Sequence, residues 1–110
     1  MLLNDERELS LKSTIYKHFN KFKMAPTAED FRIHLENKLT NLKNFGHDFK
    51  IIISGDLHTE IGYYPGPDQR MATCCQVMRK LMKPGDEILV QPPKGNGATL
   101  QIKYILTNRI

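Results

Sequence analysis

The spacing of apolar residues along the chain predicts a helix near its start. In residues 4–23, Leu11, Ile15, Phe19 and Phe22 follow one another at intervals of three or four, and lysines occupy the positions between them. This spacing places the apolar side chains on one face of a helix and the charged side chains on the other. We therefore expect an amphipathic helix over residues 4–23.

A second helix is predicted after the break at residues 24–27. Thr27 precedes Glu29 and Asp30, a pattern typical of a helix N-cap followed by acids in the first turn. The helix has an apolar stripe, and the residues of that stripe are Phe31, Leu35, Leu39 and Leu42. Gly46 is placed to end the helix in a left-handed conformation.

The middle of the chain alternates short elements and turns. The β-branched run Phe49–Ile53 predicts a strand. Asp56 is the candidate cap of a short helix over residues 56–61, and Gly62 is expected to end that helix. The glycine- and proline-rich residues 63–67 predict a turn.

A longer helix and two strands are predicted for the rest. Asp68 is the candidate cap of a helix that reaches about Lys83, and its apolar side consists of Met71, Cys74, Cys75, Met78 and Met82. Strands are expected over residues 87–91 and 98–106, since the second alternates apolar and polar positions. Residues 92–97 would form the tip of this hairpin, where Asn96–Gly97 is a strong turn dipeptide.

Length and composition limit the class of protein. The 110 residues, 40% of them hydrophobic and 25% charged, suit one globular domain, and no run is apolar enough to span a membrane. The first residues lack the pattern of a secretion signal, so we expect a cytoplasmic protein. Cys74 and Cys75 are adjacent, which favours reduced thiols, and the scattered histidines do not have metal-ligand spacing. We expect neither a metal nor another cofactor.

Positive charge is concentrated towards the C-terminus. The net charge of the chain is +4, and residues 69–110 carry seven basic against two acidic side chains. Such an excess attracts nucleic acid or an acidic partner.

The element order from residue 27 onward resembles that of the winged helix-turn-helix superfamily. That resemblance implies an α+β fold: a winged-helix core over residues 27–110, with an extra N-terminal helix in residues 1–26 and a C-terminal β-hairpin wing. The segments Gly62–Met71 and Cys74–Met78 are also similar to small uncharacterised domains of bacteria and mobile elements, a likeness that implies no function.

The winged-helix resemblance implies that residues 68–83 form a recognition helix for double-stranded DNA. The residues at helical spacing on its outward face are Gln69, Thr73, Gln76, Lys80 and Lys83. Glutamine and threonine can read base edges, so the expected base contacts are Gln69, Thr73 and Gln76. The expected phosphate contacts are Arg70, Arg79, Lys80 and Lys83, and Lys94 and Asn96 on the wing would reach the DNA backbone or minor groove. The protein would be a small transcriptional regulator or accessory DNA-binding protein.

Other interpretations stay open. The polar face can be the solvated side of an ordinary amphipathic helix. The chain can instead be an interaction module of a phage or mobile element that binds a host protein, with the N-terminal helix forming a homodimer or docking on the partner. An enzyme is not expected, because Asp56 and Glu60 share a helix face from which His58 points away. We expect His58 to be exposed or half-buried and both cysteines to be core thiols.

Overall fold

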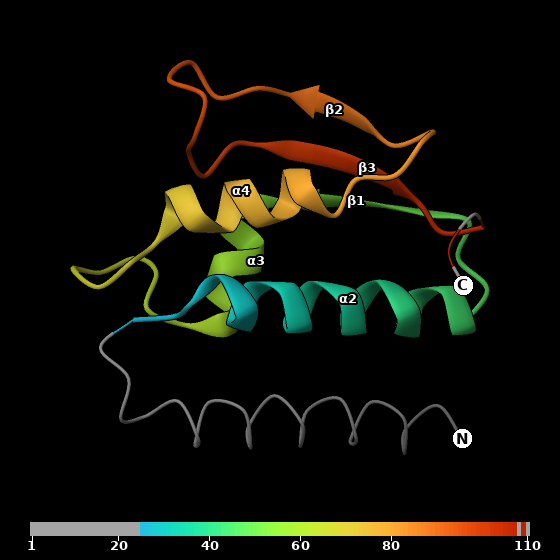
Figure 1. Ribbon diagram of the computed structural model, residues 1–110, viewed down its shortest axis with the longest axis horizontal. Helices are drawn as coiled ribbons and strands as arrows, with labels where there is room; N and C mark the ends of the chain where they lie inside the picture. Colours follow the sequence, from blue (N-terminus) through green and yellow to red (C-terminus); the bar gives the residue numbers. More distant parts are fainter. Residues whose placement is uncertain (1–24, 108, 110) are drawn as a thin grey trace.

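The computed structural model describes residues 25–107 and 109, which form a small α+β fold (Figure 1). Its elements are α2 (Ala28–Asn44), β1 (Phe49–Ile53), α3 (Ser54–Ile61), α4 (Met71–Lys80), β2 (Glu87–Val90) and β3 (Gln101–Ile105). The helix predicted for residues 4–23 lies outside the described residues. Within the described part of the chain, no helix is long and apolar enough to cross a membrane.

Both ends of α2 follow the sequence prediction. The hydroxyl of Thr27 accepts the backbone N–H of Asp30 at 3.2 Å, and the Asp30 carboxylate accepts the backbone N–H of Thr27 at 2.8 Å. This reciprocal pair satisfies two N–H groups that have no partner inside the helix. At the other end Gly46 has φ 91°, and the next residue, His47, donates to the carbonyl of Leu42 at 3.1 Å. Glycine takes this left-handed conformation without a steric penalty.

The three strands form one antiparallel sheet in which β3 lies between β1 and β2. Alternate residues of β3, Ile102 and Tyr104, are buried, and Ile52 of β1 lies beside Ile102. The opposite face of β1 carries Phe49 and Ile51, both of which remain exposed. One face of the sheet therefore contributes to the core, and the other is open.

The core lies between the helices and the buried face of the sheet. In Figure 1, α3 runs across the direction of α2 and α4 and lies between them. The fully buried apolar side chains come from α2, α3, α4, β3 and the residues on either side of β3; they include Phe31, Leu35, Leu57, Cys74, Cys75, Met78, Leu100, Ile102, Tyr104 and Leu106. The stripes predicted for α2 and α4 are thus confirmed as core, with Leu42 and Met82 half-buried at its edge.

The prediction that Asp56 caps the short helix is wrong, because α3 begins two residues earlier, at Ser54. Its first amides donate to backbone carbonyls instead: the N–H of Ser54 to Leu100 and that of Gly55 to Ala98, at 2.9 and 3.0 Å. A Cβ on Gly55 would lie 3.0 Å from the Ala98 oxygen, so glycine permits this approach. The predicted end of the helix at Gly62 is confirmed.

The helix predicted from Asp68 to Lys83 is also shorter than expected. It begins at Met71 because the preceding residues form a turn, in which Gln69 donates its N–H to Gly66 and accepts the Met71 N–H through its side chain. It ends at Lys80: beyond the C-cap residue Leu81, the Met82 N–H bonds to the carbonyl of Arg79, three residues back, and the Lys83 N–H bonds to the carboxylate of Asp86.

The hairpin between β2 and β3 has shorter strands than predicted. The β2–β3 loop spans residues 91–100, and its turn is closed by the Gly95 N–H, which donates to the Pro92 carbonyl at 2.9 Å. Gly95 has φ 86°, whereas Gly97 does not have positive φ. The expected Asn96–Gly97 turn is therefore replaced by one with Pro93 and Lys94 at its centre, which suits proline at the second position.

Candidate nucleic-acid interface

Helix α4 separates its buried and exposed residues as the spacing predicted. Gln76 and Lys80 are exposed and Thr73 is half-buried, whereas Cys74 and Met78 on the other side are fully buried. We call Thr73, Gln76 and Lys80 the exposed face of α4. These residues are close enough along the helix to meet one surface together.

Three predicted contact residues lie just beyond the ends of α4. Gln69, Arg70 and Lys83 are all exposed. The side-chain oxygen of Gln69 accepts the Met71 N–H at 2.7 Å, so its amide NH₂ group is the part that remains as a donor. Arg70 donates from its guanidinium to the carbonyl of Gln69 at 2.9 Å. These two residues border the exposed face at the start of α4.

The β2–β3 loop is bonded to the flank of α4. Lys94 and Asn96 are exposed on it, as predicted for wing residues. Arg79 of α4 donates to the side-chain oxygen of Asn96 at 2.7 Å and to the carbonyl of Gly95. The loop therefore lies next to α4, and the guanidinium of Arg79 is directed at the loop.

His58 is fully buried, so the expectation of an exposed or half-buried side chain is wrong. Its Nε2 accepts the backbone N–H of Arg70 at 2.8 Å, and its Nδ1 lies 3.0 Å from the carbonyl oxygen of Gly62. An N–H can only donate, so Nε2 is the acceptor and Nδ1 carries the proton. The ring packs against Phe31 and Tyr64, at centroid distances of 4.9 and 5.3 Å. His58 thus holds the first residue before α4 in place.

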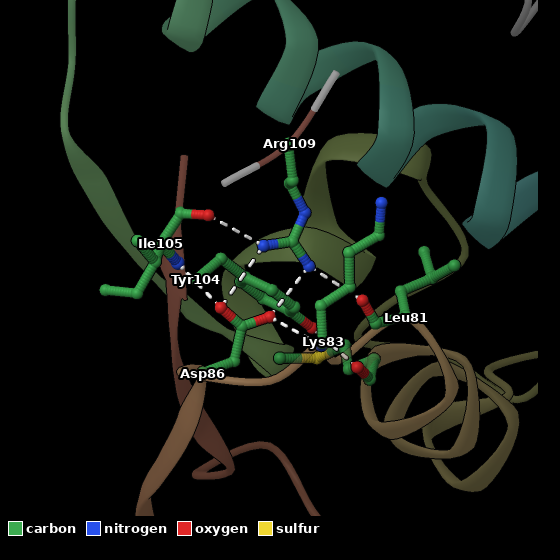
Figure 2. Close-up of polar contacts among 7 residues, drawn as sticks. Leu81, Lys83, Asp86, Tyr104, Ile105 and Arg109 are labelled. Atoms are coloured by element: carbon green, nitrogen blue, oxygen red, sulfur yellow. Dashed lines mark hydrogen bonds and ion pairs between the residues drawn. The ribbon is translucent and has the colours of Figure 1, made fainter. Parts of the chain in front are cut away.

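A buried ion pair joins the far end of α4 to the C-terminus (Figure 2). Arg109 donates to the two carboxylate oxygens of Asp86 at 3.2 and 2.8 Å and to the carbonyl of Leu81 at 2.7 Å. The Asp86 side chain has no exposed surface, and it also accepts the backbone N–H groups of Lys83 and Ile105. Every oxygen of this carboxylate is satisfied, which a buried charge requires.

The surroundings of Asp86 and Cys74 shift the pKa values of the two side chains in opposite directions. Burial raises the pKa of Asp86, but the hydrogen bonds from Arg109 and from the N–H groups of Ile105 and Lys83 outweigh it, so the net pKa is lowered. Burial raises the pKa of the Cys74 thiol, with a smaller contribution from Cys75. Asp86 is therefore held as the anion and Cys74 as the neutral thiol.

Helix α4 and its neighbours in the sequence carry several basic side chains. No acidic residue occurs between Asp68 and Asp86 in the sequence, and the negative charge of Asp86 is paired with Arg109. Lys80 of the exposed face, Arg70 and Lys83 beyond the ends of α4, and Lys94 of the β2–β3 loop are all exposed basic residues. Helix α4 itself contains no carboxylate that would offset the charge of these cations.

The residues considered for catalysis do not come together. Asp56 is exposed, whereas Glu60 is bonded on the surface to His34 and Lys38, at 2.8 and 2.5 Å. Cys74 and Cys75 are buried free thiols, which confirms them as core residues. Residues 25–107 and 109 contain no group of three His, Cys, Asp or Glu side chains that could hold a metal ion.

Sequence reasoning missed the contacts of His58, Arg79, Asp86 and Arg109. Each of them joins segments that are distant in the sequence: 12 residues separate His58 from Arg70, and 23 separate Asp86 from Arg109. A weak signal existed for Asp86, which follows the Pro84–Gly85 turn dipeptide, where aspartate often accepts local backbone N–H groups. No pattern in the sequence indicated Arg109 as its partner.

Comparisons of the chain with protein-family models, curated protein sequences and solved structures found no match.

Proposed function

We propose that this chain binds double-stranded DNA as a winged helix-turn-helix protein, a small regulator or accessory DNA-binding protein without catalytic activity. The observation that carries the proposal is the exposed face of α4, which combines hydrogen-bonding and basic side chains on a helix without acids. The major groove of DNA admits such a helix.

The topology supports the same function. The described elements follow the order helix, strand, helix, helix, strand, strand, and the sheet order is β1-β3-β2. In a winged helix-turn-helix, this order would make α3 and α4 the helix pair and the β2–β3 loop the wing. The loop's contact with Arg79 fits a wing that lies beside its recognition helix.

The residues of the interface would divide into two roles. Gln69, Thr73 and Gln76 have the side chains for base edges, as glutamine can pair with adenine through two hydrogen bonds. Arg70, Lys80 and Lys83 would meet phosphates, which fixes the register of the protein on the duplex. Lys94 and Asn96 would contact the backbone from the wing.

The proposal is tested by fluorescence anisotropy with a labelled duplex of about 24 base pairs and mixed sequence, between about 50 and 200 mM salt. We expect affinity to fall steeply with salt. Reversing both charges, Lys80→Glu with Lys83→Glu, should weaken binding at least about tenfold. It should also reduce the salt slope, which is the slope of log affinity against log salt concentration, by about 2. Lys43→Glu, in the last turn of α2, is the control for a charge reversal elsewhere. Unchanged binding by the double variant would contradict the assignment of the phosphate contacts.

A protein-binding function is the second candidate, and the open face and edge of the sheet favour it. Large apolar side chains are exposed on β1 and β2: Phe49, Ile51, Ile88, Leu89 and Val90. Exposed apolar patches often mark protein interfaces. The duplex assay separates the two functions, because a chain that only binds a protein partner shows no salt-dependent affinity for the duplex.

A further inference from the structure

We propose that Arg79 is a positioning residue of the DNA interface: it holds the tip of the β2–β3 loop against α4, so that Lys94 and α4 meet the duplex as one rigid surface. This inference rests on the proposed function. It also reassigns Arg79, which the winged-helix resemblance had placed among the expected phosphate contacts.

The base of the loop is joined to α3. The hydroxyl of Ser54 donates to the carbonyl of Gly97 at 2.5 Å, and the N–H of Gly55 donates to the carbonyl of Ala98. The Sγ of Cys75 on α4 lies 3.2 Å from the Gly97 oxygen and 3.4 Å from the Gly97 nitrogen. The end of the loop that leads into β3 is therefore attached to both helices of the pair.

The tip of the loop is attached separately, by the guanidinium of Arg79. Two different nitrogens of that group donate, one to the carbonyl of Gly95 and one to the side-chain oxygen of Asn96. A planar guanidinium can bond two oxygens at once with fixed geometry, which the ammonium of a lysine cannot reproduce. Arg79 thus uses two of its donors on oxygens of its own chain.

Lys94 lies next to this attachment but makes none of its hydrogen bonds. It lies within the turn that the Gly95 N–H closes on Pro92, directly before the two residues that Arg79 contacts, and its side chain is exposed. Asn96 keeps its NH₂ group as a donor, because its oxygen is the atom that Arg79 occupies. A loop that is already ordered loses less conformational entropy when it binds.

The reassignment is tested with a double-mutant cycle on Arg79 and Lys94, using the duplex and salt range of the binding assay. Lys94→Ala alone should weaken binding several-fold and lower the salt slope by about 0.9, the value for one phosphate contact. Arg79→Ala should weaken binding as well, and adding Lys94→Ala to it should have almost no further effect. Arg79→Lys keeps the charge but should behave like Arg79→Ala, whereas a simple phosphate contact would be preserved by lysine.

Hydrogen exchange of the loop amides in the free protein provides a readout that does not depend on DNA. Both Arg79 variants should speed exchange at Gly95 and Gly97 while the amides of α2 stay protected. Arg32→Ala, an exposed arginine of α2, is the matched control for the loss of one positive charge.

Several results would overturn the proposal. They are additive effects of Arg79→Ala and Lys94→Ala on affinity and slope, full binding by Arg79→Lys, no effect of Lys94→Ala in the unchanged chain, or unchanged exchange of the loop. None of these results contradicts the proposed function, which depends on duplex binding by the unchanged chain. Absence of duplex binding by the unchanged chain would instead overturn the proposed function, and the positioning role with it.

Discussion

The two ends of α4 are held by different kinds of interaction. At its start the Arg70 N–H is accepted by the neutral ring of His58, and at its end the Leu81 carbonyl is bonded by the guanidinium of Arg109, which is paired with Asp86. Neither end uses a side-chain cap of the common kind, since Arg70 is the N-cap residue and makes no such bond. Helix ends leave backbone groups that need partners, and here His58 and Arg109 from other segments supply partners in addition to the local side chain of Gln69.

The difference between the ends determines how each should respond to substitution. A buried ion pair leaves an uncompensated charge when one partner is removed, whereas a neutral acceptor leaves only unpaired dipoles. The cation also lies at the C-terminal end of the helix, where the helix dipole favours positive charge. We therefore expect the end held by Asp86 to be the more sensitive one.

The largest effect is expected from Asp86→Ala. This substitution leaves Arg109 without its carboxylate and the N–H groups of Lys83 and Ile105 without an acceptor. We expect a loss of about 3 kcal/mol or more in the free energy of unfolding, measured by urea denaturation. Glu87→Ala, at the neighbouring exposed carboxylate, is the control and should change stability little. Equal losses for the two variants would contradict a larger contribution of the buried pair to the free energy of unfolding.

A smaller effect is expected from His58→Phe. The new ring fills most of the space between Phe31 and Tyr64 but leaves the Arg70 N–H and the Gly62 carbonyl unpaired. We expect a loss of about 2 kcal/mol from the same measurement, because each unpaired buried group costs about 1–3 kcal/mol and part of that is regained by apolar packing. The half-buried His34 serves as control, and His34→Phe should cost less. A loss as large as that of Asp86→Ala would remove the contrast between the two ends.

The smallest effect is expected from a change of pH. The pKa of Asp86 is lowered in the folded protein, so its contribution to stability is present above the ordinary pKa of an aspartate and is lost as pH falls through the lower folded value. Urea denaturation at a series of acidic pH values should show this loss in the unchanged chain. The loss should be reduced in Asp86→Asn and kept in His58→Phe. An identical acid dependence in the unchanged chain and Asp86→Asn would contradict the assignment.

The pattern of the sequence predicted the helices and strands better than the residues at which they begin and end. The N-cap at Thr27, the left-handed Gly46 and the strand Phe49–Ile53 depend on residues that are close in the sequence, and all three are confirmed. The start of α3 was misplaced because its first amides bond to carbonyls that the fold brings from elsewhere, and the start of α4 was misplaced because the local turn between Gly66 and Met71 precedes it. An aspartate near a helix start predicts a cap only where no such partner competes.

The exposed face of α4 was predictable for the same reason, since the period of a helix by itself separates Gln76 and Lys80 from Cys74 and Met78. The role of each polar residue was not. Arg79 and Lys80 are adjacent and similarly charged, yet only the fold determines that one faces the β2–β3 loop and the other is exposed. His58 looked like a surface histidine because its acceptor function depends on a backbone N–H 12 residues away.

The sequence by itself determined which segments between Ala28 and Ile105 form helices and strands, the apolar stripes that form the core and the basic excess of residues 69–110, because these follow from local spacing and composition. Only the tertiary structure decided which polar groups are used internally, at His58, Arg79, Asp86 and Arg109. The physical reason is that a buried or half-buried polar group must find a partner wherever the fold supplies one, and that partner need not be near it in the sequence.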